Sequence, residues 1–214
     1  KRQVPAYRGK PQAEKLTFIY ADSYYQLGDF YLAGYQFERF ETSYPKSDSV
    51  EIASFKSAKS YYELSPRFSL DQEDTYKALD KLQGFINSYP NTKYRAEANE
   101  LVSELRVKVE LKDIRVAKQY LQISDYKPAI AAFDNFISDH PGSTFRKDAF
   151  FGRLDAAYQL AINSVPRLID ERLVEAKEYY SVFVKYYKDT DLMEDADIIL
   201  KDINKRLNIE EPTT

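Results

Sequence analysis

The sequence predicts an all-α protein, a solenoid of stacked helical hairpins with about nine helices wound into a right-handed superhelix. Three observations favour this class. A pattern of small and aromatic residues recurs along the chain, apolar residues are spaced at helical intervals, and glycine is rare, with six in 214 residues. A single hairpin cannot bury its own apolar stripe, so neighbouring hairpins must stack to form a core.

The repeat is clearest between Ala21 and Ser47, and the same skeleton returns 96 residues later without a gap. Partial copies of its second half lie 45 and 143 residues downstream. In the first copy the pattern consists of Ala21, Tyr24, Gly28, Asp29, Phe30, Ala33, Phe37, Phe40, Tyr44, Pro45 and Ser47. An internal repeat of this length is typical of helical arrays.

Each element of the repeat has a physical reason. Ala33, Phe37 and Phe40 follow i, i+4, i+7 spacing, which places them on one helical face. The small residue lets a facing helix approach closely, and the aromatics fill the space beside it. Gly28-Asp29 ends one helix and opens the next, and Pro45 stops the second. We expect Ser47 to cap the following helix, and the repeated apolar residues to form the core.

These signals divide the chain into one domain, residues 1–214, with hairpins at about 10–45, 47–90, 92–141 and 143–188 and a closing helix at 191–207. An insertion at Ser65–Asp71 interrupts the second hairpin. Residues 92–123 predict one long helix, because no glycine or proline occurs between Pro90 and Pro128. The small-and-aromatic pattern of each hairpin resembles the tetratricopeptide (TPR) repeat.

Composition disfavours several function classes. The formal net charge is −3, with 31 basic and 34 acidic residues intermixed, so nucleic acid is not an expected partner. The chain has no cysteine and a single histidine, His140, which we expect to face solvent or the last carbonyls of a helix. We therefore expect no metal site and no cofactor. No phosphate-binding or nucleophile-elbow motif occurs, so we do not expect an enzyme.

Several features occur together in this order: the repeat, the Tyr-Pro-x-Ser/Thr punctuation, the insertion Ser65–Gln72 and the tract Tyr89–Tyr94 before the long helix. In this combination the chain resembles the BamD family of outer-membrane β-barrel assembly lipoproteins, in the form typical of Bacteroidetes. The resemblance covers about residues 1–207. It departs at Ala132, where well-studied members carry an arginine used toward BamA, so that contact is not carried over.

The resemblance implies a non-enzymatic periplasmic scaffold at the inner face of the outer membrane. Members bind the POTRA domains of BamA, join other assembly-machine lipoproteins and help to receive unfolded outer-membrane proteins. The BamA contact is ascribed to the C-terminal repeats and the substrate contact to the N-terminal ones. The chain opens at Lys1 without a methionine, so we expect the natural start, the first hairpin and the lipid anchor to lie upstream. That anchor would be the only membrane attachment.

The TPR resemblance also implies a partner-binding groove lined by the first helix of each hairpin. Transfer through the repeat register gives eight positions: Phe18, Asp22, Tyr25, Gln26, Phe55, Lys59, Tyr62 and Glu63. The alternative for Phe18 and Phe55 is a place in the core between repeats. Arg67 and Phe68 in the insertion are a second candidate, for which we favour a loop that folds over the hairpin end with Phe68 as its anchor.

Other functions remain open alternatives. A periplasmic TPR adaptor that coordinates envelope or peptidoglycan processes would share the Tyr-Pro punctuation, and it would be distinguished by a coiled coil upstream of Lys1. A carbohydrate-binding TPR lipoprotein is less favoured, because this chain is short and has no tryptophan. An enzyme is the least favoured class.

Overall fold

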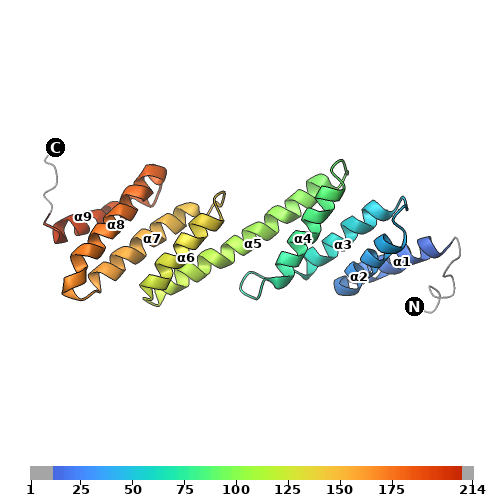
Figure 1. The fold of residues 1–214 in the computed structure, drawn as a ribbon, viewed down its shortest axis with the longest axis horizontal. Coiled ribbons are helices and arrows are strands. Elements are labelled where there is room, and N and C mark those ends of the chain that lie inside the picture. The colour runs from blue at the N-terminus through green and yellow to red at the C-terminus, as the bar shows by residue number, and fades with distance from the viewer. Residues whose placement is uncertain (1–11, 209–214) are drawn as a thin grey trace. The chain divides into compact units, whose positions relative to one another are not determined.

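The computed structural model describes residues 12–208, and all regular structure in that range is α-helical (Figure 1). The helices are α1 (Ala13–Gln26), α2 (Phe30–Ser43), α3 (Val50–Leu64), α4 (Glu73–Ser88), α5 (Arg95–Gln122), α6 (Tyr126–Asp139), α7 (Arg146–Ile162), α8 (Pro166–Tyr187) and α9 (Met193–Arg206). The start of the first predicted hairpin, residues 10 and 11, lies outside the described residues.

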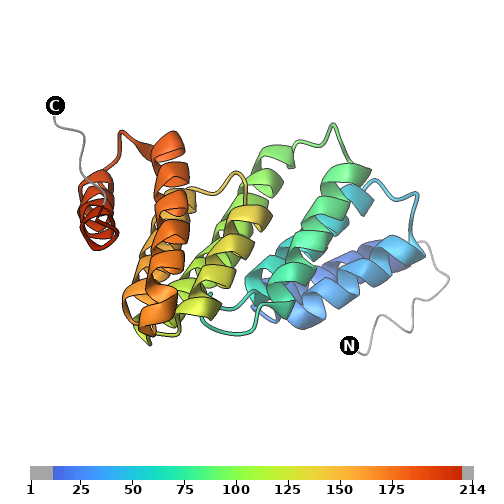
Figure 2. The ribbon, with the colours of Figure 1, turned by 60° about the vertical axis from the view of Figure 1, so that its left-hand side comes forward.

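The chain divides into two compact units, residues 1–109 and 110–214, with the boundary inside α5. In the first unit, α1 packs on α2, α2 on α3 and α3 on α4. In the second unit, α6 packs on α7, α7 on α8 and α8 on α9 (Figure 2). The predicted class, an all-α array of helical hairpins, is confirmed. The handedness of the superhelix and a single continuous domain stay predictions.

The core of each unit includes the repeated residues. Ala21, Ala33, Phe37 and Phe40 are fully buried and pack together in the first unit, as predicted. Tyr24 is half-buried at the edge of this cluster. The equivalents in the other copies are also buried: Ala78, Leu82, Phe85, Ala117, Ala129, Phe133, Phe136, Ala176 and Phe183. The recurring spacing therefore identifies residues that are buried in the same way in each copy of the repeat.

The turn between the two helices of a hairpin uses a left-handed residue. Gly28 has φ of +76°, and the N–H of Asp29 donates to the carbonyl of Tyr24 at 3.0 Å. This bond satisfies a carbonyl left over at the end of α1. The side chain of Asp29 then accepts a bond from the N–H of Leu32 at 3.3 Å, which caps α2. The short turn thus ends one helix and starts the next.

The prediction for Ser47 needs a correction. Helix α3 begins at Val50, and Ser47 lies in the turn before it. Its hydroxyl accepts a bond from the N–H of Ser49 at 3.0 Å and donates to the carboxylate of Glu14 at 2.5 Å. Ser47 therefore joins the turn before α3 to the first helix of the preceding hairpin rather than capping the next helix.

This hydroxyl–carboxylate contact recurs in two further copies. The hydroxyl of Thr92 donates to Glu51 at 2.6 Å, and that of Ser143 donates to Glu110 at 2.8 Å. Each hydroxyl also accepts the N–H of the residue two positions later. A partly buried polar contact that repeats in this way fixes the register in which successive hairpins stack.

Helix α5 is long because it belongs to both units. In α3 the buried residues Ala53 and Ala58 are five positions apart, whereas their equivalents Ala98 and Ala117 in α5 are nineteen apart. The additional fourteen residues make about four helical turns, so the apolar stripe stays nearly in phase. The first part of α5 packs into the core of the first unit and the last part into that of the second.

The insertion between α3 and α4 is an ordered loop. Gln72, which is 3% exposed, donates from Nε2 to the carbonyls of Arg67 at 3.0 Å and Leu70 at 2.9 Å. Its Oε1 accepts the hydroxyl of Thr75 at 2.8 Å. Phe68 is only half-buried. The loop does fold back at the hairpin end, but the buried amide of Gln72 organises it.

Candidate partner-binding face

The eight predicted groove residues lie on α1 and α3, the first helices of the two hairpins in the first unit. Phe18, Asp22 and Tyr25 are half-buried on α1, and Gln26 is exposed at its end. On α3, Lys59 and Tyr62 are half-buried, Glu63 is exposed, and Phe55 is only 4% exposed. The register therefore placed seven of the eight side chains at least partly at the surface.

Phe55 belongs to the core. Its ring is stacked on that of Tyr94, with centroids 4.6 Å apart and planes 12° from parallel, and it also contacts Phe85 at 5.3 Å. Phe55 thus lies in the core between repeats, which was the alternative to a place in the groove. Phe18 differs, because its ring contacts Phe37 and Phe40 by the edge and stays partly accessible.

The polar groove residues are paired with the next first helix along the chain. Asp22 forms an ion pair with Lys56 of α3, and Lys59 forms one with Glu97 of α5 at 2.6 Å. The hydroxyl of Tyr62 donates to the carboxylate of Glu104. This hydrogen bond is the main reason that the pKa of Tyr62 rises to about 12. These contacts link α1 to α3 and α3 to α5.

Tyr25 contributes a ring to this face. It packs edge-on against Phe30 and Phe37, and the ammonium of Lys56 lies 5.3 Å from its ring centroid. Burial is the main cause that raises the pKa of its hydroxyl. The ring of Tyr25 therefore supports the core, while the residue as a whole stays half-buried.

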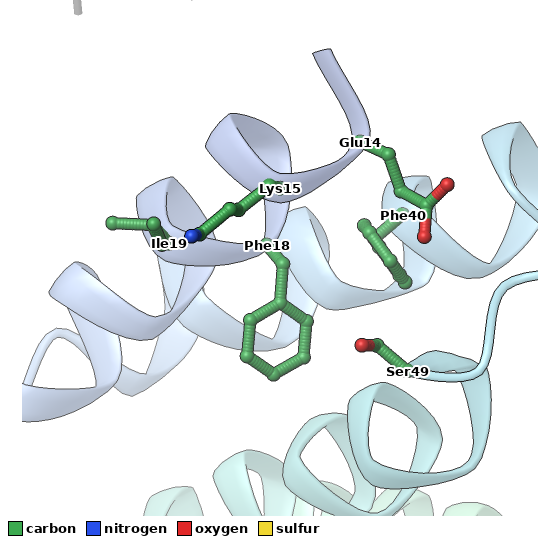
Figure 3. A pocket seen from close by; sticks show the side chains of 6 residues that line it. All are labelled: Glu14, Lys15, Phe18, Ile19, Phe40 and Ser49. Carbon is green, nitrogen blue, oxygen red and sulfur yellow. The ribbon is translucent and has the colours of Figure 1, made fainter. Parts of the chain in front are cut away.

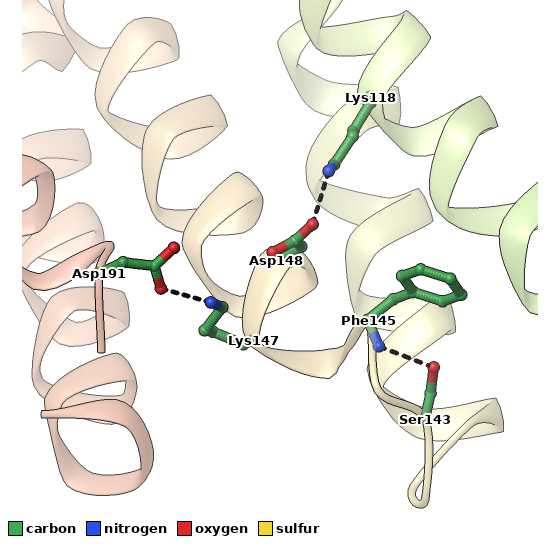
Figure 4. A network of polar contacts seen from close by, with 6 residues as sticks. All are labelled: Lys118, Ser143, Phe145, Lys147, Asp148 and Asp191. Atoms are coloured by element: carbon green, nitrogen blue, oxygen red, sulfur yellow. Dashed lines mark hydrogen bonds and ion pairs between the residues drawn. The ribbon is translucent and has the colours of Figure 1, made fainter. Parts of the chain in front are cut away.

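The row of paired side chains has counterparts in the second unit. Lys118 of α5 contacts Asp148 of α7 at 2.8 Å, and Lys147 forms an ion pair with Asp191, just before α9 (Figure 4). Tyr158 of α7 donates to Asp202 of α9 at 2.7 Å. In each unit, then, neighbouring first helices are joined through polar side chains that stand 30 to 44 residues apart in sequence.

The sequence analysis missed the partners of the groove residues. Lys56, Glu97 and Glu104 do not stand at equivalent positions of the repeat. The available signal is weak: polar or oppositely charged residues on successive first helices, one or two helical turns out of register. Such charges are common on exposed helices, so this pattern alone does not identify a pair.

His140 also differs from its expected surroundings. It occupies the repeat position of Tyr44 and Tyr89, and its ring packs on Phe136 with centroids 4.8 Å apart. Its Nε2 lies 2.9 Å from Oδ2 of Asp113 in α5. His140 is thus a partly buried link between α5 and the end of α6 and does not face open solvent.

No group of three or more His, Asp or Glu side chains among residues 12–208 is arranged to hold a metal ion. No helix in the same range is long and apolar enough to cross a membrane.

Comparison with known proteins now places this architecture. The family model YfiO, described as an outer membrane lipoprotein, matches residues 4–167. The chain is 26% identical over 126 residues to "Outer membrane protein assembly factor BamD" of Caulobacter vibrioides, which covers 59% of this chain and 41% of that protein. It is 23% identical over 191 residues to the protein of the same name from Rickettsia prowazekii, covering 88% of this chain and 70% of that protein.

The family model thus matches well over half of the chain, and the match includes residues of both units. The resemblance to BamD that the repeat, the insertion and the Tyr-Pro punctuation predicted is confirmed. This chain belongs to the YfiO family of outer membrane lipoproteins.

Proposed function

We propose that this chain is the repeat region of an outer-membrane protein assembly factor, and that it acts as a scaffold without catalytic activity. The observation that carries the proposal is the family match over residues 4–167, joined by two relatives named as assembly factors. The chain spans 41% of the Caulobacter relative and 70% of the Rickettsia one, so the proposal concerns this region. Its place is the periplasmic face of the outer membrane, with a lipid anchor upstream of Lys1.

The proposed partners are the POTRA domains of BamA, other lipoproteins of the assembly machine and unfolded outer-membrane proteins. A helical array suits this role, because its hairpins present a long surface on rigid elements. Many of its surface side chains are tyrosines, which supply contact area at a low entropic cost. Tyr31 and Tyr35 on α2, for example, are 73% and 50% exposed.

We assign the BamA contact to the C-terminal end of the chain, where α9 closes the second unit. Ala196, Ile199 and Ile203 form its buried face. Its other face carries Ile198, which is 59% exposed among charged neighbours. An exposed isoleucine on a polar helix provides a single apolar anchor of the kind that a partner surface can cover.

The test is calorimetric binding of this chain to the POTRA domains of BamA from the same organism. Ile198→Ser is the informative variant, because removal of α9 would uncover the core of the second unit. We expect the affinity to fall by about fivefold or more, the loss typical of a contact residue. Asn135→Ala, an exposed change on α6, is the matched control. An intact protein that shows no POTRA binding would overturn the proposed partner.

The predicted groove is tested in the same assay with an unfolded outer-membrane protein held in a low concentration of urea. Gln26→Ala and Glu63→Ala are the suitable changes, because these two residues are exposed, whereas Tyr25 and Phe55 support the core. Weaker binding of the unfolded protein with unchanged POTRA binding would support the groove. Equal loss of both would instead indicate damage to the fold, which circular dichroism detects.

A further inference from the structure

One position of the repeat is aromatic or large in three copies and small in the fourth. It stands two residues after the conserved hydroxyl, directly before the next first helix, and is occupied by Ser49, Tyr94, Phe145 and Leu192. The backbone is nearly the same at three of these positions: φ and ψ are −93° and 1° at Ser49, −85° and 2° at Phe145, and −86° and −1° at Leu192. Side chains at this position therefore leave the turn in the same direction.

Tyr94 shows what this side chain does. Its ring lies flat on Phe55 at 4.6 Å, and Phe55 is only 4% exposed as a result of its neighbours. In the second unit, Phe145 packs against the buried cluster that contains Ile114 and Phe136. In these two copies the residue before the first helix thus covers the apolar side chain of the preceding first helix.

In the first copy this position is Ser49, whose side chain is too small to fill the same place. Phe18 is the equivalent of Phe55, 37 residues earlier, and Phe40 is the equivalent of Phe85. A hollow of about 540 Å³ lies here, and it is lined by Glu14, Lys15, Phe18, Ile19, Phe40 and Ser49 (Figure 3). Phe18 points between α1 and the start of α3, towards Ser49, and it is more accessible than Phe55.

We propose that this hollow binds an aromatic side chain from a partner polypeptide, which takes the place that Tyr94 fills in the next copy. The chemistry of the occupant follows from the internal comparison: the rings of Phe18 and Phe40 line the hollow, and Phe55, the equivalent of Phe18, is stacked on the flat ring of a tyrosine. An aromatic ring also gains from offset stacking beyond the area that it buries. The proposed ligand of this hollow is an aromatic side chain. Its binding is tested separately from POTRA binding, so the failure of one proposal does not decide the other.

The rim of the hollow suits a side chain with a polar end. The carboxylate of Glu14 already accepts the hydroxyl of Ser47, so it is engaged on the protein. Lys15 is exposed and lies beside Ile19 at the rim. Its ammonium is in place to donate to a phenol oxygen, which favours tyrosine over phenylalanine as the occupant.

The probe for this site is N-acetyl-L-tyrosinamide, titrated at millimolar concentration and followed by NMR of isotope-labelled protein. We expect shifts that saturate and that are centred on Phe18, Ile19 and Ser49. N-acetyl-L-leucinamide is the matched probe, and we expect it to bind more weakly. Equal binding of both probes would overturn the aromatic preference, and shifts centred elsewhere would overturn the location.

Two reciprocal variants make the test specific. Ser49→Tyr should fill the hollow from within, because the backbone there matches that of the other copies and Ser49 makes no side-chain cap. We expect probe affinity at Phe18 to fall at least about tenfold, which corresponds to the loss of one good stacking contact. Tyr94→Ser should open the equivalent hollow over Phe55 and create a second set of shifting signals there.

The outcomes are separable. Unchanged probe binding in a folded Ser49→Tyr variant would refute the proposal, as would the absence of any saturable shift in the native protein. Tyr94→Ser removes a core contact and lowers stability, so a second variant at position 49 is also needed. Ser49→Leu leaves the core intact and fills the hollow only in part. It copies Leu192, whose position borders a smaller hollow of about 310 Å³, and we expect intermediate affinity.

Discussion

Gly152 of α7 lies directly against the ring of Phe133 in α6, so close that a Cβ at position 152 would stand 2.6 Å from Cε1 and 2.8 Å from Cε2 of the ring. Phe133 is fully buried and belongs to the repeated core of the second unit. A methyl group at position 152 would therefore force the ring of Phe133 or the helix backbone to shift. The absence of a side chain at position 152 is therefore what allows α6 and α7 to pack at this distance.

This contact predicts the effect of Gly152→Ala. The added methyl overpacks the core, and we expect the free energy of unfolding to fall by about 1–3 kcal/mol. The measurement is urea unfolding followed by circular dichroism.

Gly84 is the matched control, because it lies in α4 and a Cβ there would meet nothing within 4 Å. We expect Gly84→Ala to raise stability by up to about 1 kcal/mol, from helix propensity alone. If both substitutions changed stability in the same direction, the packing argument for Gly152 would be wrong.

A second prediction concerns the loop before α4. Gln72→Ala removes the donors to the carbonyls of Arg67 and Leu70 and the acceptor of the Thr75 hydroxyl. We expect a loss of about 1–3 kcal/mol, the usual cost of leaving buried polar groups unpaired. Hydrogen exchange should become faster in residues 65–72, whereas Gln83→Ala, on an exposed part of α4, should leave it unchanged.

The helices were predictable from local signals. The bounds of α2 match the prediction because Gly28-Asp29 and Tyr44-Pro45 act through their own backbone preferences, which need no knowledge of neighbours. The core was predictable because the period of Ala33, Phe37 and Phe40 determines which face is buried.

The contacts between hairpins were not predictable in the same way. Whether Asp22 meets Lys56 or Lys59 depends on the offset between two helices, and the sequence leaves that offset open. The place of Phe55 in the core likewise depends on Tyr94, which comes from the next hairpin. Gln72 was overlooked because a glutamine at a loop end is more often exposed, and only its buried hydrogen bonds reveal its role.

A third prediction concerns alkaline pH. The hydrogen bond to Glu104 raises the pKa of Tyr62 to about 12, above the ordinary value of 10. The folded state therefore favours the neutral phenol, so this contribution to stability is complete below pH 10 and is lost as the pH rises from 10 to about 12. We expect Tyr62→Phe to lose less stability than the native protein between pH 9 and 11.5.

The cause of that pKa shift is tested by Glu104→Gln. This variant keeps the shape of the partner and removes its negative charge, so the pKa of Tyr62 should fall toward 10. Absorbance at 295 nm measures the ionisation of tyrosine. If the difference spectrum between native protein and Tyr62→Phe titrated near pH 10 in both backgrounds, the contact between Tyr62 and Glu104 would have no effect on ionisation.

The last prediction compares two equivalent turn positions of the repeat, Gly28 and Ser124. Ser124 stands where the first copy has Gly28, and it has φ of +63°, a left-handed conformation that costs a residue with a side chain about 1 kcal/mol. The hydrogen bond from the N–H of Asp125 to the carbonyl of Tyr120, at 2.9 Å, holds it there. Ser124→Gly should keep this bond, remove the strain and raise the thermal midpoint.

Two further variants serve as controls. The reverse change, Gly28→Ser, should lower stability by a similar amount. Ser181→Gly inside α8 should also lower stability, because glycine weakens a helix interior. Were Ser124→Gly to destabilise the protein as Ser181→Gly does, helix propensity rather than the left-handed turn would determine the outcome at this position.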